Sequence, residues 1–303
     1  GGPKVVVGGQ PVPLQPPTLL APLAEGEGAF AEPGAEPAPR QGKVVALFGC
    51  KGGVGNTFTA VNLSVALSRT HNVCLVDMDL QMGDVLVSMN MEGRCAISHL
   101  IREIRNEGDA FNPRNILDRH EATGAYVVSQ VHCLEELDLL KPHDVSNLFY
   151  FMKQRFPFVV VDGLRSFDDN SMAILDAADQ ILLVVNQDVP SVRSAGRSME
   201  IFRRIGYEQM KMTVVINRYY KKALVSPEYI AMSLNTDRVM TIRHDFDLVV
   251  KSLNEGAPLH LLAPASRITG DIDALADTLR EKSGPGAKAR SKGLLSSLAF
   301  WRK

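Results

Sequence analysis

The sequence contains little cysteine, few aromatic residues and almost no net charge. Its four cysteines, at positions 50, 74, 95 and 133 of 303, lie far apart and form no C-x-x-C pair. This spacing argues against a zinc or iron–sulfur site and is typical of proteins of the reducing cytosol. The formal charge of -1 gives the chain no bulk basic character, so nucleic acid is not expected as a partner.

Long apolar runs are also missing. No stretch reaches the length of a membrane-spanning helix, and no secretory signal is visible. Residues 1–41 hold 9 of the 17 prolines, together with Gly, Ala and Glu and hardly any apolar periodicity. Such a composition cannot bury enough surface to offset its ordering entropy, so a disordered Pro/Gly/Ala-rich linker is expected. Because the sequence starts with Gly, a further domain before this linker is left open.

A glycine-rich stretch organises the remainder of the chain. GCKGGVGNT, residues 49–57, follows an apolar run at 43–48 that predicts a buried parallel strand, and it precedes residues 58–69, which predict a helix. Glycines permit a tight turn, so that successive backbone N–H groups and the positive end of the helix converge on one anion. Strand, turn and helix together predict a phosphate-binding loop. The alternative is a glycine turn that binds nothing.

The loop departs from the Walker A pattern at one position. A Walker A loop ends in G-K-[ST], whereas Asn56 takes the lysine position here, followed by Thr57 as the magnesium-binding hydroxyl. The positive charge stands earlier, at Lys51. A lysine there resembles the deviant Walker A loop of the ParA/MinD ATPases, and this resemblance implies that Lys51 reaches across a nucleotide-dependent homodimer.

The same resemblance implies ATP and Mg²⁺ as ligands and a P-loop NTPase fold over residues 42–282. That fold is an α/β doubly wound, mostly parallel sheet with helices on both faces. Further apolar periodicity predicts strands at 72–79, 126–128, 156–163, 180–186, 212–216 and 239–242, and helices at 96–104, 145–155, 245–253 and 268–279. The loop residues expected to contact the nucleotide are Lys51, Gly52, Gly53, Val54, Gly55, Asn56, Thr57 and Phe58.

Carboxylates follow two of the predicted strands. Asp77 and Asp79 end the first of them at alternate positions, so both side chains should point the same way if the strand continues. Their segment, DMDLQMGDV, resembles the D-x-D-L-Q-F-G-D segment of the CpaE/TadZ proteins, the ParA/MinD branch associated with Tad-type pili. The resemblance to the superfamily implies that Asp77 lies near magnesium and that Asp79 orients the attacking water. Asp79 and Lys51 are therefore the candidate catalytic residues.

Residues 156–163 form a Walker B pattern, in which a buried strand delivers Asp162 to the magnesium. Arg165, just beyond it, is interpreted as a surface charge rather than a partner contact. The strand at 212–216 runs into Asn217, whose side-chain amide suits the donor and acceptor of an adenine edge, as the superfamily implies. Arg218 is a weaker candidate for the same site.

The C-terminal residues 283–303 form a basic amphipathic tail. Five basic and no acidic residues stand from Lys288 onward, and helical spacing would place the apolar residues on one face. Such a helix suits an anionic lipid surface, with a contact to a partner protein or a frayed tail as the alternatives. The candidate residues are Lys292, Leu294, Leu295, Leu298, Phe300, Trp301 and Arg302.

These features favour an ATP-binding positioning or assembly factor resembling CpaE/TadZ. It would form an ATP-sandwich dimer, partner with pilus or secretion machinery and hydrolyse ATP weakly or not at all, because Asn56 removes a charge from the phosphates. The expected location is cytoplasmic, with peripheral association at the inner membrane or a cell pole. One alternative is an active ParA-like ATPase for DNA or cargo partitioning. The other is a scaffold that has lost nucleotide binding.

Overall fold

The computed structural model describes residues 6–7, 10–11, 41–130, 136–137 and 140–281. The chain divides into two units, Gly1–Ala38 and Pro39–Lys303. In the first, β1 (Val6–Val7) pairs with β2 (Gln10–Pro11) in an antiparallel sheet. The remainder of the expected linker and the expected tail at 283–303 lie outside the described residues, so both assignments stay predictions.

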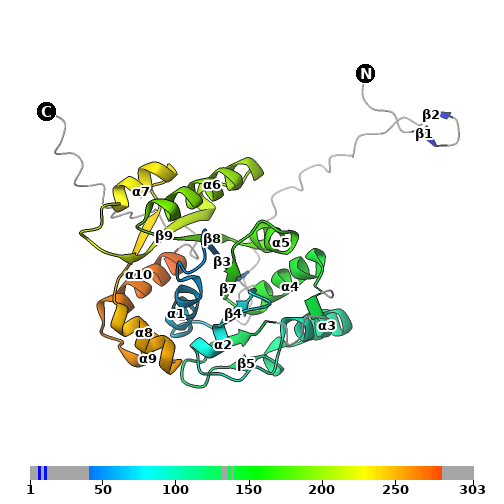
Figure 1. Cartoon of the computed structure of the whole chain (residues 1–303). Helices are drawn as coiled ribbons and strands as arrows, with labels where there is room; N and C mark the ends of the chain where they lie inside the picture. Colours follow the sequence, from blue (N-terminus) through cyan, green and yellow to red (C-terminus); the bar gives the residue numbers. More distant parts are fainter. Residues whose placement is uncertain (1–5, 8–9, 12–40, 131–135, 138–139, 282–303) are drawn as a thin grey trace, which may run out of the picture. The chain divides into compact units, whose positions relative to one another are not determined.

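The second unit is built on an eight-stranded sheet (Figure 1). Its order is β10-β9-β8-β3-β7-β4-β6-β5, and every neighbouring pair is parallel except β5 with β6. The central strands are almost continuously apolar because both of their faces are covered by helices. The strands are β3 (Lys43–Gly49), β4 (Val73–Asp77), β5 (Asp118–Arg119), β6 (Tyr126–Val128), β7 (Phe158–Leu164), β8 (Gln180–Asn186), β9 (Met212–Tyr219) and β10 (Val239–Arg243).

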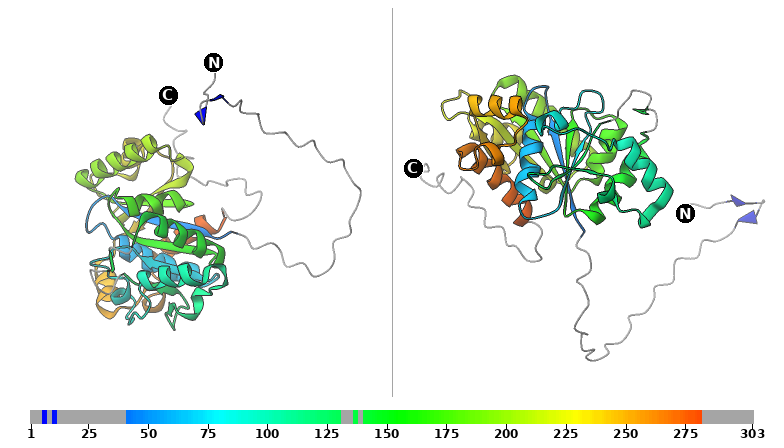
Figure 2. Two further views of the ribbon diagram at one scale, coloured as in Figure 1. Left: turned by 90° about the vertical axis from the view of Figure 1, so that its right-hand side faces the viewer. Right: turned by 90° about the horizontal axis from the view of Figure 1, so that it is seen from below.

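Helices cover both faces of the sheet, and each face has its own apolar core (Figure 2). One core contains residues of α3 (Ile97–Glu107), α4 (Pro142–Arg155), α5 (Asp169–Ala177), α6 (Val189–Ile205) and α7 (Pro227–Leu234). The other contains residues of α1 (Asn56–Ser68), α2 (Val85–Ser88), α9 (Leu259–Leu262) and α10 (Arg267–Glu281), with α8 (Phe246–Glu255) packed beside them. The predicted doubly wound α/β class is confirmed.

The first helix, α1, is enclosed rather than amphipathic. The sequence suggests a single apolar stripe, but every residue from Phe58 to Leu67 is buried, because α10 and α9 cover the side of α1 that the sheet does not. Asn62 stabilises this arrangement. Its Nδ2 donates to the carbonyl of Phe58 at 2.9 Å, and its Oδ1 accepts from the amide of Leu259 at 2.7 Å. The helix that follows the glycine loop therefore has a fixed position.

Most predicted long elements are confirmed within a few residues. The strand at 180–186 is found as predicted, whereas the strand predicted at 72–79 ends at Asp77. None of the helices in the described part of the chain is long and apolar enough to cross a bilayer. The parallel strands place the carboxyl ends of β3, β4, β7 and β9 at one edge of the sheet, where ligands bind in open α/β folds.

Candidate nucleotide-binding site

The glycine-rich loop connects the end of β3 to the start of α1. Gly53 and Gly55 have φ angles of 74° and 92°, a region that side chains disfavour. A Cβ on Gly55 would stand 2.1 Å from Nδ2 of Asn217, so this position has no room for a side chain either. Gly55 is the N-cap of α1 and supplies no side chain to the first turn. The amides of that turn are thus left for another acceptor, as an anion site requires.

Asn56 does not point toward a phosphate. Its Nδ2 donates to the carbonyl of Leu47 in β3 at 3.0 Å, which ties the start of α1 back to the strand before the loop. Its buried Oδ1 has no hydrogen-bond partner within the described residues. The residue at the Walker A lysine position therefore holds the loop in shape and brings no positive charge to it.

Other predicted loop residues divide between core and surface. Val54 and Phe58 are buried, so their side chains belong to the core and only their backbone amides are left as candidates for contact with a nucleotide. The side chain of Lys51 is exposed and makes no hydrogen bond or ion pair with any part of the chain that the structure describes. Its ammonium group is available to a ligand or to a second subunit.

Two buried carboxylates lie side by side behind the loop. Asp77 and Asp162 are register partners on the adjacent parallel strands β4 and β7, and their side chains are 0% and 1% exposed. Burial, followed by the nearby Asp162, raises the pKa of Asp77 to about 7. Burial also raises the pKa of Asp162, an effect that the Thr57 hydroxyl and the Gly163 amide oppose. This arrangement disfavours two negative charges unless a cation joins them.

The pair satisfies a test for a bound cation. Neither carboxylate oxygen of Asp162 completes a hydrogen bond of regular geometry within the described residues, although both oxygens are buried. Thr57 is thus only a weak partner of Asp162. A native protein pairs nearly all of its buried polar atoms, so these unpaired oxygens indicate a missing ligand. Carboxylates and a hydroxyl are the hard oxygen donors that Mg²⁺ takes together with phosphate oxygens and water, and Thr57, Asp77 and Asp162 fit that set.

Gly83 belongs to this site, although sequence reasoning did not single it out. A Cβ at position 83 would stand 2.2 Å from Oδ2 of Asp77, so only glycine lets the loop after β4 close over this carboxylate. Asp77 accepts the amide of Asp79 at 3.0 Å and the amide of Val85 at 3.3 Å. The signal was present in the DLQMGD segment, where the glycine was quoted only as part of a resemblance.

Asp79 does not lie where strand alternation would put it. Because β4 ends at Asp77, Asp79 stands in the following loop, and its backbone amide binds the Asp77 carboxylate. The Asp79 carboxylate is 21% exposed and forms an ion pair with Arg165, with 2.6 Å between Oδ2 and Nη2. The prediction that both aspartates point the same way along a strand is therefore wrong. Arg165, interpreted from the sequence as a surface charge, is 54% exposed, and its partner within the chain is Asp79.

Asn217 and Arg218 both attach the end of β9 to the glycine-rich loop. Asn217, 5% exposed, donates from Nδ2 to the carbonyl of Val54 at 2.7 Å and accepts the amide of Arg218 at 2.8 Å. Arg218 has a φ of 53° and donates from Nη2 to the carbonyl of Gly53 at 3.1 Å. An amide side chain has a second N–H and a second lone pair, so contact with a base is compatible with these bonds.

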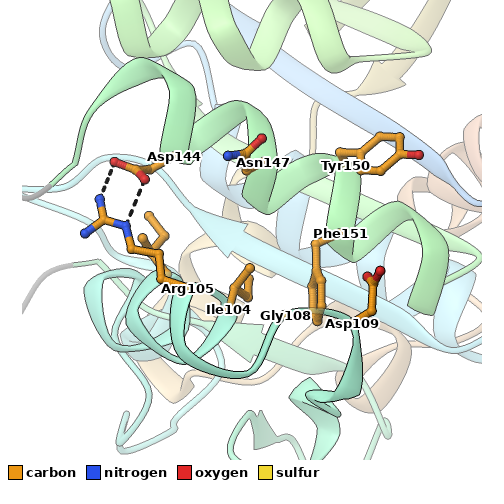
Figure 3. A pocket seen from close by; sticks show the side chains of 9 residues that line it. Ile104, Arg105, Gly108, Asp109, Asp144, Asn147, Tyr150 and Phe151 are labelled. Carbon is orange, nitrogen blue, oxygen red and sulfur yellow. Dashed lines mark hydrogen bonds and ion pairs between the residues drawn. The ribbon is translucent and has the colours of Figure 1, made fainter.

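A separate pocket of about 270 Å³ lies between α3 and α4 (Figure 3). Arg105 on α3 points across it to Asp144 on α4, which is buried and whose pKa this arginine lowers against the effect of burial. Tyr150 and Phe151 line the same space. None of the predicted nucleotide residues lies in this pocket, so it does not belong to the candidate site.

Comparison with known proteins agrees with this geometry. The model of the CobQ/CobB/MinD/ParA nucleotide binding domain matches residues 45–259. The septum site-determining protein MinD of Thermotoga maritima is 24% identical over 266 residues, covering 85% of this chain and 96% of that protein.

Two solved structures are similar to this fold. The ParA family ATPase of Chlorobium tepidum superposes with a TM-score of 0.70 at 20% identity, covering 77% of this chain and 98% of that one. MinD of Pyrococcus horikoshii, solved with Mg-ADP, superposes with a TM-score of 0.69 at 18% identity, covering 82% of this chain and 99% of that one. Family model, sheet order and loop agree, and the chain therefore belongs to the CobQ/CobB/MinD/ParA nucleotide-binding domain family.

Proposed function

We propose that the protein binds ATP with Mg²⁺ and uses it to hold two subunits together rather than to drive rapid turnover. The observation that carries this proposal is the side chain of Asn56, which donates to the carbonyl of Leu47, while no side chain caps the first turn of α1. Binding needs the backbone amides and the dipole of α1, both of which are present. Fast phosphoryl transfer also needs fixed positive charge at the phosphates, which Asn56 does not supply.

In this proposal, different residues would bind the phosphates, Mg²⁺ and the base. The amides of residues 52–58 would hold the phosphates, and Thr57, Asp77 and Asp162 would hold Mg²⁺, which neutralises phosphate charge when it is bound. The free ammonium group of Lys51 would contact the nucleotide of the partner subunit, and Asn217 with Arg218 would face the base. The biological role we propose is that of a CpaE/TadZ-like factor, which localises or assembles a Tad-type pilus or secretion system.

Equilibrium titration of a fluorescent ATP analogue tests the binding step, with and without Mg²⁺. We expect saturable binding that weakens when Mg²⁺ is chelated, and a monomer-to-dimer shift in light scattering when ATP is added. Lys51→Ala should abolish the shift but leave most of the analogue binding, because the other loop contacts remain. Absence of binding would support the scaffold alternative, and a hydrolysis rate equal to that of ordinary ParA proteins would contradict the slow turnover proposed here.

An active ParA-like role in DNA partitioning is the second candidate. Its support is a row of arginines on α6, but two of these already have partners. Arg204 pairs with Glu200 at 2.5 Å, and Arg203 donates to the carbonyl of Leu234 at 2.6 Å. Arg193 and Arg197 remain, which is little charge for a nonspecific DNA surface. A gel shift with random duplex at low salt separates the candidates, because binding that falls steeply with salt would favour partitioning.

We also propose that the C-terminal tail brings a cytoplasmic protein to the inner membrane surface or a cell pole. Its sequence combines the apolar residues Leu294, Leu295, Leu298, Phe300 and Trp301 with basic residues such as Lys292 and Arg302. Cosedimentation with vesicles containing anionic lipid should be lost in a chain that ends at residue 281. Retention of binding after this truncation would contradict the proposal.

A further inference from the structure

The end of β7 is joined to the loop that follows β4. Beyond the last residue of β4, the amide of Met78 donates to the carbonyl of Asp162 at 3.1 Å, which extends the contact of β7 from β4 to this loop. Gly163, the next residue of β7, lies against the same loop. Its φ is 91°, and a Cβ there would stand 2.1 Å from the amide nitrogen of Asp79. The end of β7 and the loop after β4 are thus in direct backbone contact.

Arg165 adds a charged contact to this backbone contact. Its Nη2 lies 2.6 Å from Oδ2 of Asp79, and the two residues are 86 positions apart in sequence. Both belong to the wall of a pocket of about 360 Å³, which also receives Asp168 and Ser171 from the start of α5. Among the described residues that line this pocket, Arg165 is the only basic one. The pair is half open to solvent, since Arg165 is 54% exposed and Asp79 21%.

The Asp79–Arg165 pair also lies within electrostatic reach of the buried carboxylates. The charge of Arg165 lowers the pKa of Asp162, whereas the charge of Asp79 raises it. Asp79 also raises the pKa of Asp77.

We propose that Arg165 is a positioning residue that restrains Asp79 and slows hydrolysis independently of Asn56. This inference rests on the proposed function and on the role that the resemblance to the ParA/MinD ATPases implies for Asp79, which is to orient the attacking water. An oxygen that already accepts a guanidinium N–H is held along that bond and has less freedom to accept a hydrogen bond from a water molecule in another direction. Asp79 has to leave or share this bond before it can orient a water molecule. Hydrolysis is then slowed in two ways, by the missing positive charge at position 56 and by the ion pair that holds the Asp79 carboxylate.

Arg165→Ala tests the restraint in the full chain. A partly exposed ion pair contributes little net energy, so we expect the steady-state hydrolysis of Mg-ATP to rise by about fivefold. Arg165→Lys keeps a positive charge beside Asp79 and should stay near the wild-type rate. Arg204→Ala is the matched control, because Arg204 forms a similar exposed pair with Glu200 on α6. Its rate should not change.

A second measurement needs no nucleotide. Hydrogen exchange of residues 78–84, followed by mass spectrometry in the absence of ligand, should be several-fold faster in Arg165→Ala than in the wild type or in Arg204→Ala. If the wild-type rate is below detection, the hydrolysis comparison is made in an Asn56→Lys background. Lower hydrolysis in Arg165→Ala would show that Arg165 assists the reaction instead, and unchanged hydrolysis with unchanged exchange would likewise overturn the inference.

The failure of this inference differs from the failure of the proposed function. If the wild type binds the ATP analogue but Arg165→Ala changes neither rate nor exchange, only the restraint is disproved. If the wild type binds no nucleotide, the proposed function is disproved. In that case, unchanged hydrogen exchange of residues 78–84 in Arg165→Ala still overturns the proposed restraint. Faster hydrogen exchange would show only a structural contact without an effect on hydrolysis, which also overturns the proposed restraint.

Discussion

Asn217 donates from Nδ2 to the carbonyl of Val54 at 2.7 Å, across 163 positions of sequence, and so connects the end of β9 to the glycine-rich loop. The bond is buried, and a Cβ at position 55 would stand 2.1 Å from the same amide nitrogen, so Gly55 leaves room for it. The shape of the loop thus depends on a strand two places away from β3 in the sheet. A residue expected to read the base thus also shapes the glycine-rich loop.

Asn217→Asp should weaken nucleotide binding. The substitution keeps the size of the side chain but replaces the donor with an oxygen that faces the carbonyl of Val54. A buried acceptor left without its donor costs about 1–3 kcal/mol, so we expect affinity for a fluorescent ATP analogue to fall by about tenfold and the melting temperature to fall with it. Asn72→Asp, at an exposed position before β4, is the control. Wild-type affinity and melting in Asn217→Asp would contradict this role.

Gly163→Ala should destabilise the fold. The new methyl group would overlap the backbone of Asp79 at 2.1 Å in a conformation that disfavours side chains, so we expect a loss of at least about 2 kcal/mol in the free energy of unfolding. Gly270→Ala is the matched control. A Cβ at this position within α10 meets no atom within 4 Å, and alanine there should stabilise by up to about 1 kcal/mol. Urea unfolding measures both, and equal effects of the two would refute the close contact.

Long buried strands were predictable because both of their faces are apolar. β8 (Gln180–Asn186) was predicted at its observed bounds, and the Walker B strand was predicted to deliver Asp162 to the site, as β7 does. Short elements such as α2 (Val85–Ser88) and β5 (Asp118–Arg119) were missed, because four or two residues are too few to establish a period. Periodicity also cannot tell where a strand ends, which is why Asp79 was placed on β4.

The orientation of side chains at the candidate site was less predictable from the sequence than which residues lie there. The sequence shows that Asn56 is neutral, but only the fold brings the carbonyl of Leu47 to its amide. Arg165 and Asp79 are 86 positions apart, and no local pattern connects them. Gly83 would have been recognised only by asking what stands opposite it, namely the carboxylate of Asp77. Sequence motifs thus selected candidate residues that the fold brings together, but not the contacts that hold them.

Asn56→Lys should accelerate hydrolysis. Removing one fixed donor from a transition-state site commonly costs about 10²- to 10³-fold in turnover, so restoring a lysine should raise the rate by at least about tenfold even if it is imperfectly placed. Asn56→Gln lengthens the side chain without adding charge and should not raise the rate. Steady-state phosphate release measures all three chains. Equal acceleration by lysine and glutamine would show that the effect comes from breaking the bond to Leu47, not from charge.

The raised pKa of Asp77 predicts how stability depends on pH. A carboxyl whose pKa is about 7 in the fold and 3.8 in its ordinary state binds protons more tightly when folded. Its contribution to stability is therefore fully present below about pH 4 and is lost as the pH rises to about 7, where the folded protein must hold a buried charge. Asp162, whose pKa is raised in the same direction, adds to this effect.

Asp77→Asn removes the titrating group, so its stability relative to the wild type should increase between pH 4 and 7. Other carboxylates of the fold titrate in both chains, and the difference between the two chains largely cancels them. The expected change in that difference is a few kcal/mol at most, since each unit of pKa shift corresponds to about 1.4 kcal/mol. Urea unfolding in EDTA at several pH values measures it without bound metal. A difference that stays constant from pH 4 to 7 would mean that Asp77 is not held in the low-dielectric setting that raises its pKa.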